Sequence, residues 1–260
     1  MNFTTSLLPA VIDSGQSPDQ VADIAVVIDV LRATSVMATA LNAGAREIMT
    51  CREVAVAFDL AADSNPMPLL CGERGCQRID GFDFGNSPAE YLEDRVRDRR
   101  LILTTTNGTR AIESVESVPV VVTSSFLNLS STVRFLADYQ RVHLVCAGTE
   151  GEVTLEDSLL AGAILWKCVW ERGGETMDDA SVLAMQLWRS WFLEDVQREE
   201  MPDADSLADK FRESRGGRNL LRLGFDDDLR RCAVIDSLDV VPMRGRSDPA
   251  TFTLVASNSR

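Results

Sequence analysis

The chain has 260 residues, a formal net charge of −14 at pH 7, 45% hydrophobic residues and 25% charged residues. These proportions are typical of a soluble globular protein, and no stretch approaches the ~18 consecutive apolar residues of a membrane span. The negative charge argues against general binding of nucleic acids or anionic membrane surfaces, since both require clustered Lys and Arg. The first residues lack the basic start and long apolar core of a signal peptide, so we expect a cytoplasmic protein.

Six cysteines occur at positions 51, 71, 76, 146, 168 and 232, and several lie within apolar runs. None of them forms a C-x-x-C pair, and His143 is the only histidine, so the spacing does not fit the common structural zinc sites. We therefore expect reduced cysteines in the core of the protein and no zinc.

Short apolar runs alternate with longer helical patterns through the first half of the chain. The apolar runs predict strands at 24–29, 47–51, 69–71, 101–105, 120–124 and 141–146, and the segments between them predict helices at 35–42, 52–63, 109–114 and 128–139. Strands joined by crossover helices are typical of an α/β protein. We expect a three-layer α/β/α sandwich with a largely parallel or mixed sheet.

The second half of the chain is mostly helical in pattern. Helices are predicted at 155–170, 178–194 and 203–215, with a break at Gly216 and Gly217. All four tryptophans fall in the first two helices, at spacings of three and four residues that suit packing between helices or subunits. Residues 239–242 predict an edge strand, because Pro242 suits an edge.

Length and composition also bound the domains. The chain is long enough for one large domain or two modest ones, so residues 1–242 form either a single α/β domain or two subdomains divided near residue 150. Residues 243–260 are rich in Ser, Arg, Pro and Thr, and we expect them to form a loose C-terminal tail.

The first candidate site follows the strand at 24–29, where Asp29 and Arg32 precede two hydroxyl residues that open a helix. Thr34 and Ser35 suit a helix N-cap, and the free N–H groups of a first turn favour a bound anion. A carboxylate beside a phosphate needs a metal ion between them or a catalytic role, while arginine matches the geometry of phosphate. The alternative is an ion pair between Asp29 and Arg32 that only closes the strand end.

A second candidate segment is the long loop at 71–88. It carries Glu73, Arg74, Arg78 and Asp83 among four glycines, and its length for a compact domain indicates a function. The alternative is a solvated Ω-loop whose charges pair with one another.

A third segment continues the strand at 101–105 into a corner made of Thr105, Thr106, Asn107 and Gly108, with Arg110 two residues further on. Hydroxyls and backbone amides at such a corner are able to surround a phosphate. Ligands of parallel sheets lie at the carboxyl ends of strands, so we expect this corner to lie near the first two segments.

A fourth segment ends the strand at 141–146 and leads to Glu156 and Asp157. These acids either complement the dipole of a new helix or bind a metal. Together with Asp29, Glu73 and Asp83, Asp157 completes a set of carboxylates without histidine or thiol, which favours Mg²⁺ over zinc. Phosphoryl chemistry follows, because Mg²⁺ and Arg neutralise phosphoryl oxygens while a carboxylate orients water or attacks phosphorus.

These segments resemble, in the same order, those of the Mg²⁺-dependent 2-phosphosulfolactate phosphatases of the coenzyme M biosynthetic type. The matching motifs are VIDVLRATS (27–35), GERG (72–75), GFDFGNSP (81–88), TTTNGTR (104–110), SFLN (125–128), CAG (146–148) and LED (155–157), and residues 216–232 and 240–242 are similar to the C-terminal part. Cys76 stands where the family pattern leads us to expect a second glycine. The resemblance implies hydrolysis of 2-phosphosulfolactate to sulfolactate and phosphate with Mg²⁺ as cofactor.

Our leading hypothesis is therefore a Mg²⁺-dependent phosphatase with Asp29, Arg32 and Glu73 as catalytic residues. Asp29 is either metal ligand or nucleophile, Arg32 and the corner at 105–108 hold the phosphoryl group, and Glu73, Asp83 and Asp157 complete the metal site. A haloacid-dehalogenase mechanism is disfavoured, since it needs a second Asp two positions after the first.

Further arginines suit the remaining charges of the substrate. Arg74, Arg78 and Arg110 are expected to bind its carboxylate and sulfonate. Three alternatives remain: a phosphatase for another small phosphorylated hydroxyacid, a lyase that binds its substrate through the same anion-binding groups, and a non-catalytic anion-binding protein. A homodimer is compatible with the sequence.

Overall fold

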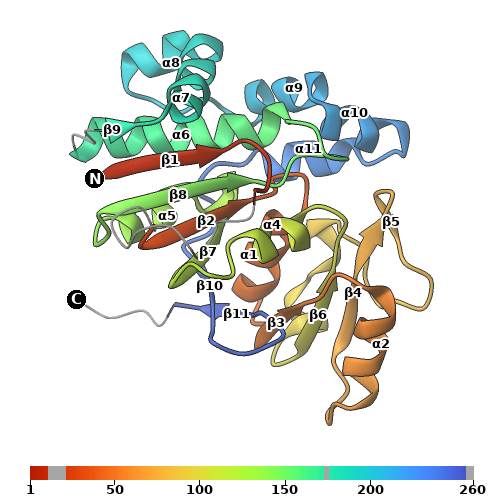
Figure 1. The fold of residues 1–260 in the computed structure, drawn as a ribbon. Helices are drawn as coiled ribbons and strands as arrows, with labels where there is room; N and C mark the ends of the chain where they lie inside the picture. The colour runs from red at the N-terminus through yellow and green to blue at the C-terminus, as the bar shows by residue number, and fades with distance from the viewer. Residues whose placement is uncertain (11–21, 173–175, 256–260) are drawn as a thin grey trace.

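The computed structural model describes residues 1–10, 22–172 and 176–255 (Figure 1). Its strands are β1 (Asn2–Ser6), β2 (Ile24–Ile28), β3 (Glu47–Thr50), β4 (Leu69–Arg74), β5 (Gln77–Arg78), β6 (Arg100–Thr104), β7 (Val120–Ser124), β8 (Arg141–Cys146), β9 (Thr176–Met177), β10 (Pro242–Arg244) and β11 (Thr251–Leu254). Its helices are α1 (Ala33–Asn42), α2 (Val54–Ala62), α3 (Glu93–Val96), α4 (Gly108–Ser114), α5 (Leu129–Leu136), α6 (Leu155–Arg172), α7 (Asp179–Trp191), α8 (Leu193–Arg198), α9 (Ala204–Glu213), α10 (Arg215–Arg222) and α11 (Asp226–Cys232), with 3₁₀ turns η1 (Pro88–Glu90) and η2 (Phe126–Asn128).

The strands form one mixed sheet in the order β5-β4-β6-β3-β11-β10-β7-β2-β8-β1-β9. Two groups of parallel strands, β4-β6-β3 and β7-β2-β8-β1-β9, are separated by the antiparallel hairpin β10–β11. The α/β fold and the mixed sheet expected from the sequence are confirmed. The six strands predicted in the first half of the chain are all present, with ends that differ by at most a few residues.

The C-terminal segment differs from its prediction, and β1, β5 and β9 were not predicted. The expected loose tail over 243–260 instead contributes β10 and β11 to the middle of the sheet, while residues 256–260 lie outside the described part. The strand expected at an edge over 239–242 begins at Pro242 and lies between β7 and β11. A proline is tolerated there because it is the first residue of its strand, where it interrupts no ladder bond.

Helices cover both faces of the sheet, as the alternation of side chains along β2 shows. Ile24, Val26 and Ile28 pack into a core with α5, α6, α7 and the helices that follow them. Ala25 and Val27 point to the opposite face and pack with α1 and α4. Figure 1 shows α6 to α11 gathered on one side of the sheet. The three layers follow from a strand that is apolar on both faces.

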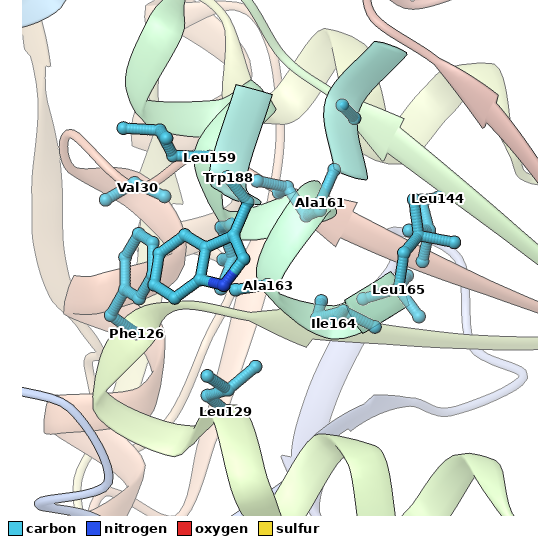
Figure 2. Packing of buried hydrophobic residues seen from close by; sticks show 14 of the residues in the cluster. Val30, Phe126, Leu129, Leu144, Leu159, Ala161, Ala163, Ile164, Leu165 and Trp188 are labelled. Atoms are coloured by element: carbon cyan, nitrogen blue, oxygen red, sulfur yellow. The ribbon is translucent and has the colours of Figure 1, made fainter. Parts of the chain in front are cut away.

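The long helices α6 and α7 pack closely against each other. Trp188 of α7 is fully buried and stacks on Phe126 with ring centroids 6.0 Å apart, among leucines and alanines of α6 (Figure 2). Trp166 is also buried, whereas Trp170 is 59% exposed. Helix packing therefore accounts for two of the four tryptophans directly.

The glycine pair at 216–217 was predicted to interrupt the helices, but both residues lie in the first turn of α10. A Cβ on Gly217 would lie 1.8 Å from the carbonyl oxygen of Phe211. Ser214 caps this helix by accepting a hydrogen bond from the Gly217 N–H at 2.9 Å. Gly217 is required because α10 begins in close contact with α9, and Gly216 because it lies against Glu156 of α6; the sequence pattern alone shows neither contact.

None of the six cysteines, all of which lie within the described residues, forms a disulfide, and all but Cys76 are buried, as expected for reduced cysteines in the core. No helix within residues 1–10, 22–172 and 176–255 is long and apolar enough to cross a membrane. The division of residues 1–242 into one domain or two stays a prediction.

Gly162 sets the distance between α6 and α7, and its replacement tests this packing. A Cβ at this position would lie 2.2 Å from the carbonyl oxygen of Ala184. Alanine favours a helix over glycine by about 1 kcal/mol, but overpacking against a backbone atom costs about 1–3 kcal/mol, so we expect Gly162→Ala to lower the free energy of unfolding. Denaturant unfolding measures it, with the open-site variant Gly245→Ala as the control that stays near the wild type.

Candidate active site

The corner between β2 and α1 is held by a set of short-range hydrogen bonds. The Thr34 hydroxyl donates to the carbonyl oxygen of Asp29 at 2.9 Å, and the Ser35 hydroxyl donates to that of Val30 at 2.8 Å. The Ala33 N–H donates to Asp29 Oδ1 at 3.2 Å. These bonds fix the carboxyl group of Asp29 at the carboxyl end of a central strand.

The predicted N-cap role of the two hydroxyl residues is wrong. Helix α1 begins at Ala33 and its N-cap residue is Arg32, because the hydroxyls of Thr34 and Ser35 bond backward to the strand end instead. Both side chains are buried, and neither lines the pocket described below. Their contribution is to position Asp29.

Glu73, at the end of β4, connects two loops. Its Oε1 accepts a hydrogen bond from the Thr106 N–H at 2.9 Å, and its Oε2 accepts one from the Cys76 N–H at 2.8 Å. Cys76 lies in the tight turn between β4 and β5 with φ of 64°. The segment at 71–88 thus begins with a hairpin tied to the corner after β6, and this contradicts a loop whose charges only pair with one another.

The corner between β6 and α4 approaches Asp29 closely. A Cβ on Gly108 would lie 2.8 Å from Asp29 Oδ2 and 2.7 Å from the Cβ of Ala33, so only glycine permits this approach. The Thr109 N–H donates to the Thr105 hydroxyl at 3.2 Å. The corner is therefore packed directly against the acid that ends β2.

The guanidinium of Arg32 is buried among groups from three parts of the chain. Its Nη1 donates to Asp228 Oδ2 of α11 at 2.6 Å, and its Nη2 donates to the Cys76 carbonyl oxygen at 2.8 Å. The ring of Phe225 lies 4.5 Å from the guanidinium carbon. The ion pair of Arg32 is with Asp228, so the alternative of a simple pair with Asp29 is not what the structure shows.

These groups surround one pocket at the carboxyl ends of β2, β4 and β6. Its lining comprises Asp29, Leu31, Arg32, Glu73, Cys76, Asn86, Thr105, Asn107, Thr149, Gly216 and Asn219. The structure therefore brings together the three predicted catalytic residues and part of the predicted corner at 105–108, together with the start of α10.

Among the predicted residues that do not line this pocket, four have side chains engaged elsewhere. The Arg74 guanidinium donates to the carbonyl oxygens of Glu73 and Arg52, and that of Arg78 donates to the carbonyl oxygen of Asp83. Arg110 lines a different cavity. Asp83 is exposed, and its Oδ2 accepts the Leu70 N–H at 2.8 Å. Strand alternation points Arg74 away from the side on which Glu73 lies, which a motif does not reveal.

The remaining predicted residues support the pocket from behind. The side chain of Thr106 is exposed, and its N–H serves Glu73. Asp157 is buried and accepts hydrogen bonds from the N–H groups of Val30 at 2.9 Å and Gly148 at 3.0 Å. Asp157 therefore joins the ends of β2 and β8. No group of three or more His, Cys, Asp or Glu within the described residues is arranged to hold a metal.

The carboxyl groups around the pocket disfavour one another's ionised forms. Burial, together with the charges of Glu73 and Glu156, raises the pKa of Asp29 to about 7, against the hydrogen bond from Ala33 and the charge of Arg32. Burial, with Glu156 and Asp29 nearby, also raises the pKa of Asp157 well above its usual range. Burial raises the pKa of Glu156, and its Oε2 has no hydrogen-bond partner. Excess negative charge here favours a bound proton or cation.

Sequence reasoning missed Asp228 and the pocket-lining amides of Asn86 and Asn219. Asp228 is the third acid of a run that resembles a solvated first turn of a helix. Its spacing from Leu229 and Cys232 nevertheless places it on the buried face of α11. That periodicity was the available signal, and no local pattern identifies the two asparagines.

The fold and the pocket define an α/β protein with a small, acid- and arginine-lined site at the carboxyl ends of its strands. The sequence matches the family described as 2-phosphosulpholactate phosphatase over residues 11–246, and the chain belongs to this family.

Relatives similar to this chain carry the name probable 2-phosphosulfolactate phosphatase. One from Synechococcus sp. strain JA-3-3Ab is 40% identical over 237 residues, which cover 87% of this chain and 90% of the relative. One from Synechococcus sp. strain RCC307 is 40% identical over 252 residues, covering 92% and 97%. One from Thermotoga maritima is 38% identical over 218 residues, covering 84% and 87%. The resemblance noted from the motifs is confirmed.

The raised pKa of Asp29 predicts a pH-dependent effect of its neutralisation on stability. An aspartate ionises near pH 4 in the unfolded chain but near pH 7 in the fold, so wild-type stability falls as the pH rises through this window. Asp29→Asn does not lose stability in this window, because asparagine does not ionise. In EDTA, its free energy of unfolding should exceed that of the wild type by near zero at pH 4 and by on the order of 3 kcal/mol at pH 8.

Denaturant unfolding at both pH values measures this difference. Asp59→Asn, at an exposed site on α2, serves as the control and should show no such change. An Asp29→Asn effect of equal size at pH 4 and pH 8 would contradict the electrostatic account.

Proposed function

We propose that the chain is a Mg²⁺-dependent phosphatase that hydrolyses 2-phosphosulfolactate to sulfolactate and phosphate. The observation that carries the proposal is the convergence of Asp29, Arg32 and Glu73 on one pocket, in a member of this family. The relatives are named for this activity. A place in coenzyme M biosynthesis, a cytoplasmic location and a homodimer are further predictions of the sequence.

The residues of the pocket suit the charge distribution of phosphoryl transfer. Hydrolysis forms a bond from a water oxygen to phosphorus, breaks the phosphorus–oxygen ester bond and leaves a hydroxyl on sulfolactate. Arg32 binds the phosphoryl oxygens, since this residue lines the pocket and its guanidinium is fixed by Asp228 and the Cys76 carbonyl oxygen. The corner at 105–108 positions the phosphoryl group beside Asp29.

The donor set of the pocket fits Mg²⁺ in the way that this ion commonly binds. Mg²⁺ is usually held by one or two carboxylates and by substrate phosphate rather than by a cage of protein ligands. Asp29 and Glu73 are the two carboxylates that line the pocket, and both are 7% exposed. When bound, the ion neutralises the phosphoryl oxygens. Asp29 serves either as its ligand or as the nucleophile, and capture of a phosphorylated protein by rapid quenching distinguishes the two roles.

The sequence suggested arginines as the groups that bind the carboxylate and sulfonate of the substrate, but the side chains available in the pocket for this role are neutral amides. Asn86 is buried, lines the pocket, and its Oδ1 has no hydrogen-bond partner. Such an amide is preorganised for a ligand group, because leaving it unpaired costs about 1–3 kcal/mol. Asn219 of α10 lines the same pocket. We assign the carboxylate or sulfonate of the substrate to the NH₂ groups of these amides, which donate, while the unpaired Asn86 Oδ1 accepts from a hydroxyl or a water.

The proposed function predicts phosphate release from racemic 2-phosphosulfolactate that requires Mg²⁺ and is abolished by EDTA. Asp29→Asn should reduce kcat/KM by at least 100-fold, because the variant removes the ionisable oxygen at the centre of the site. Asp59→Asn should retain wild-type activity. Preference for phospholactate or phosphoglycerate would support phosphatase activity but contradict 2-phosphosulfolactate as the substrate. Binding of the esters without hydrolysis would contradict the assignment as an enzyme.

The role of the amide predicts a different kinetic signature. Asn86→Ala should raise KM for 2-phosphosulfolactate by about tenfold, and it should affect phospholactate less if the amide contacts the sulfonate. Steady-state kinetics with both esters measures the comparison. Equal kinetic constants for the wild type and Asn86→Ala on both esters would contradict the assignment.

A further inference from the structure

Helix α11 contacts Arg32, a residue of the pocket, through one side chain. Asp228 is 3% exposed and uses both carboxylate oxygens: Oδ2 accepts from Arg32 Nη1 at 2.6 Å, and Oδ1 accepts from the Ser87 hydroxyl at 2.6 Å. Arg32 and Asp228 are 196 residues apart in the chain. The pocket lining includes Arg32 but neither Asp228 nor Ser87, so the acid lies behind the arginine.

The contacts of Arg32 fix its guanidinium in position and in plane. Asp228 and the Cys76 carbonyl oxygen hold its two terminal nitrogens, and the Phe225 ring lies 4.5 Å from its central carbon. Charge-assisted bonds of this length are the strong class of hydrogen bond, and a planar group held at both ends and on one face has little freedom left. An arginine prepared in this way loses little conformational entropy when it binds an anion.

We propose that Asp228 is a positioning residue that sets the phosphate-binding geometry of Arg32, so that the C-terminal helices complete the active site. The inference rests on the proposed function and adds a residue to it. Ser87, at the start of η1, orients the carboxylate of Asp228 and so links the loop at 81–88 to the same arginine.

A structural role alone makes different predictions from a positioning role. Removing one partner of a buried ion pair destabilises a fold whether or not the pair serves catalysis. Loss of stability therefore does not separate the two, but the affinity of the folded protein for phosphate does. A positioning residue acts through the group that it holds. A positioning role therefore predicts that the effect of Asp228 on phosphate affinity depends on the guanidinium of Arg32, whereas a structural role does not.

The test compares Asp228→Asn with Asp227→Asn, the exposed neighbour on the same helix turn. The first readout is the dissociation constant of inorganic phosphate measured by calorimetry with Mg²⁺ present, under conditions where both variants are folded. The second is kcat/KM for 2-phosphosulfolactate. We expect Asp228→Asn to weaken phosphate binding about tenfold and to lower kcat/KM by tenfold or more, while Asp227→Asn stays within twofold of the wild type.

The same substitution in an Arg32→Lys background completes the test. There we expect Asp228→Asn to change phosphate affinity by less than twofold, because lysine lacks the planar group that the carboxylate holds. If Asp228→Asn does not fold, Ser87→Ala gives the second variant, with an expected loss in the same direction. Unchanged phosphate affinity in Asp228→Asn or Ser87→Ala, or an equal effect in both backgrounds, would overturn the proposal.

The two readouts separate this inference from the proposed function. A wild-type protein that binds phosphate but hydrolyses none of the esters refutes the proposed function, and the phosphate affinities of the variants still decide the role of Asp228. A wild-type protein that neither binds phosphate nor hydrolyses an ester overturns both.

Discussion

Burial of the Arg32 charge is the constraint on which much of the remaining structure depends. A buried charge without a partner costs several kcal/mol, so the fold has to supply acceptors where the chain leaves β2. It supplies a carboxylate from α11, a carbonyl oxygen from the β4–β5 turn and an aromatic face from Phe225. These three contacts bring the last helices and the first long loop against the end of β2. A charge near the start of the chain thereby organises segments that close the pocket.

The buried acids in and near the pocket are subject to the same constraint, because a buried negative charge also needs partners. Asp157 is satisfied by backbone N–H groups from two strand ends, and Glu73 by N–H groups from two loops, so each carboxylate joins pieces of backbone that would otherwise separate. Asp29 accepts a hydrogen bond from the Ala33 N–H, but burial, with the charges of Glu73 and Glu156, raises its pKa. Perturbed groups of this kind concentrate at functional sites, because a fold pays in stability for a reactive residue.

The sequence was sufficient for the periodic parts of the fold. Short runs rich in β-branched residues, such as 120–124, favour a strand, and the predicted bounds of that strand match β7. The hairpin β10–β11 was missed because its pairing partners, β7 and β3, lie far away in the chain, and short strands with Pro and Gly nearby resemble a tail. Gly216 was read as a break for a similar reason: the carboxylate of Glu156, which a Cβ there would meet at 2.0 Å, is contributed by another helix.

The candidate site was also predictable only in part: the sequence predicted the residues that sheet topology brings together, but not those that depend on side-chain direction or distant contacts. Asp29, Arg32 and Glu73 follow strands whose carboxyl ends meet, so topology alone brings them together. Arg74 and Arg78 flank the β4–β5 turn and Arg110 faces another cavity, because side-chain direction depends on register and helix phase rather than on proximity in a motif. Asp228 required the tertiary structure, since nothing near it in sequence indicates that its partner is an arginine at the other end of the chain.

The most direct test of the central claim is a crystal structure of the protein with Mg²⁺, sulfolactate and phosphate. The account predicts the phosphate in the pocket lined by Asp29, Glu73 and Asn107, with its oxygens within hydrogen-bond distance of the Arg32 guanidinium. Phosphate bound instead in the cavity lined by Arg52, Arg110 and Arg244, with the pocket at Asp29 empty, would contradict it.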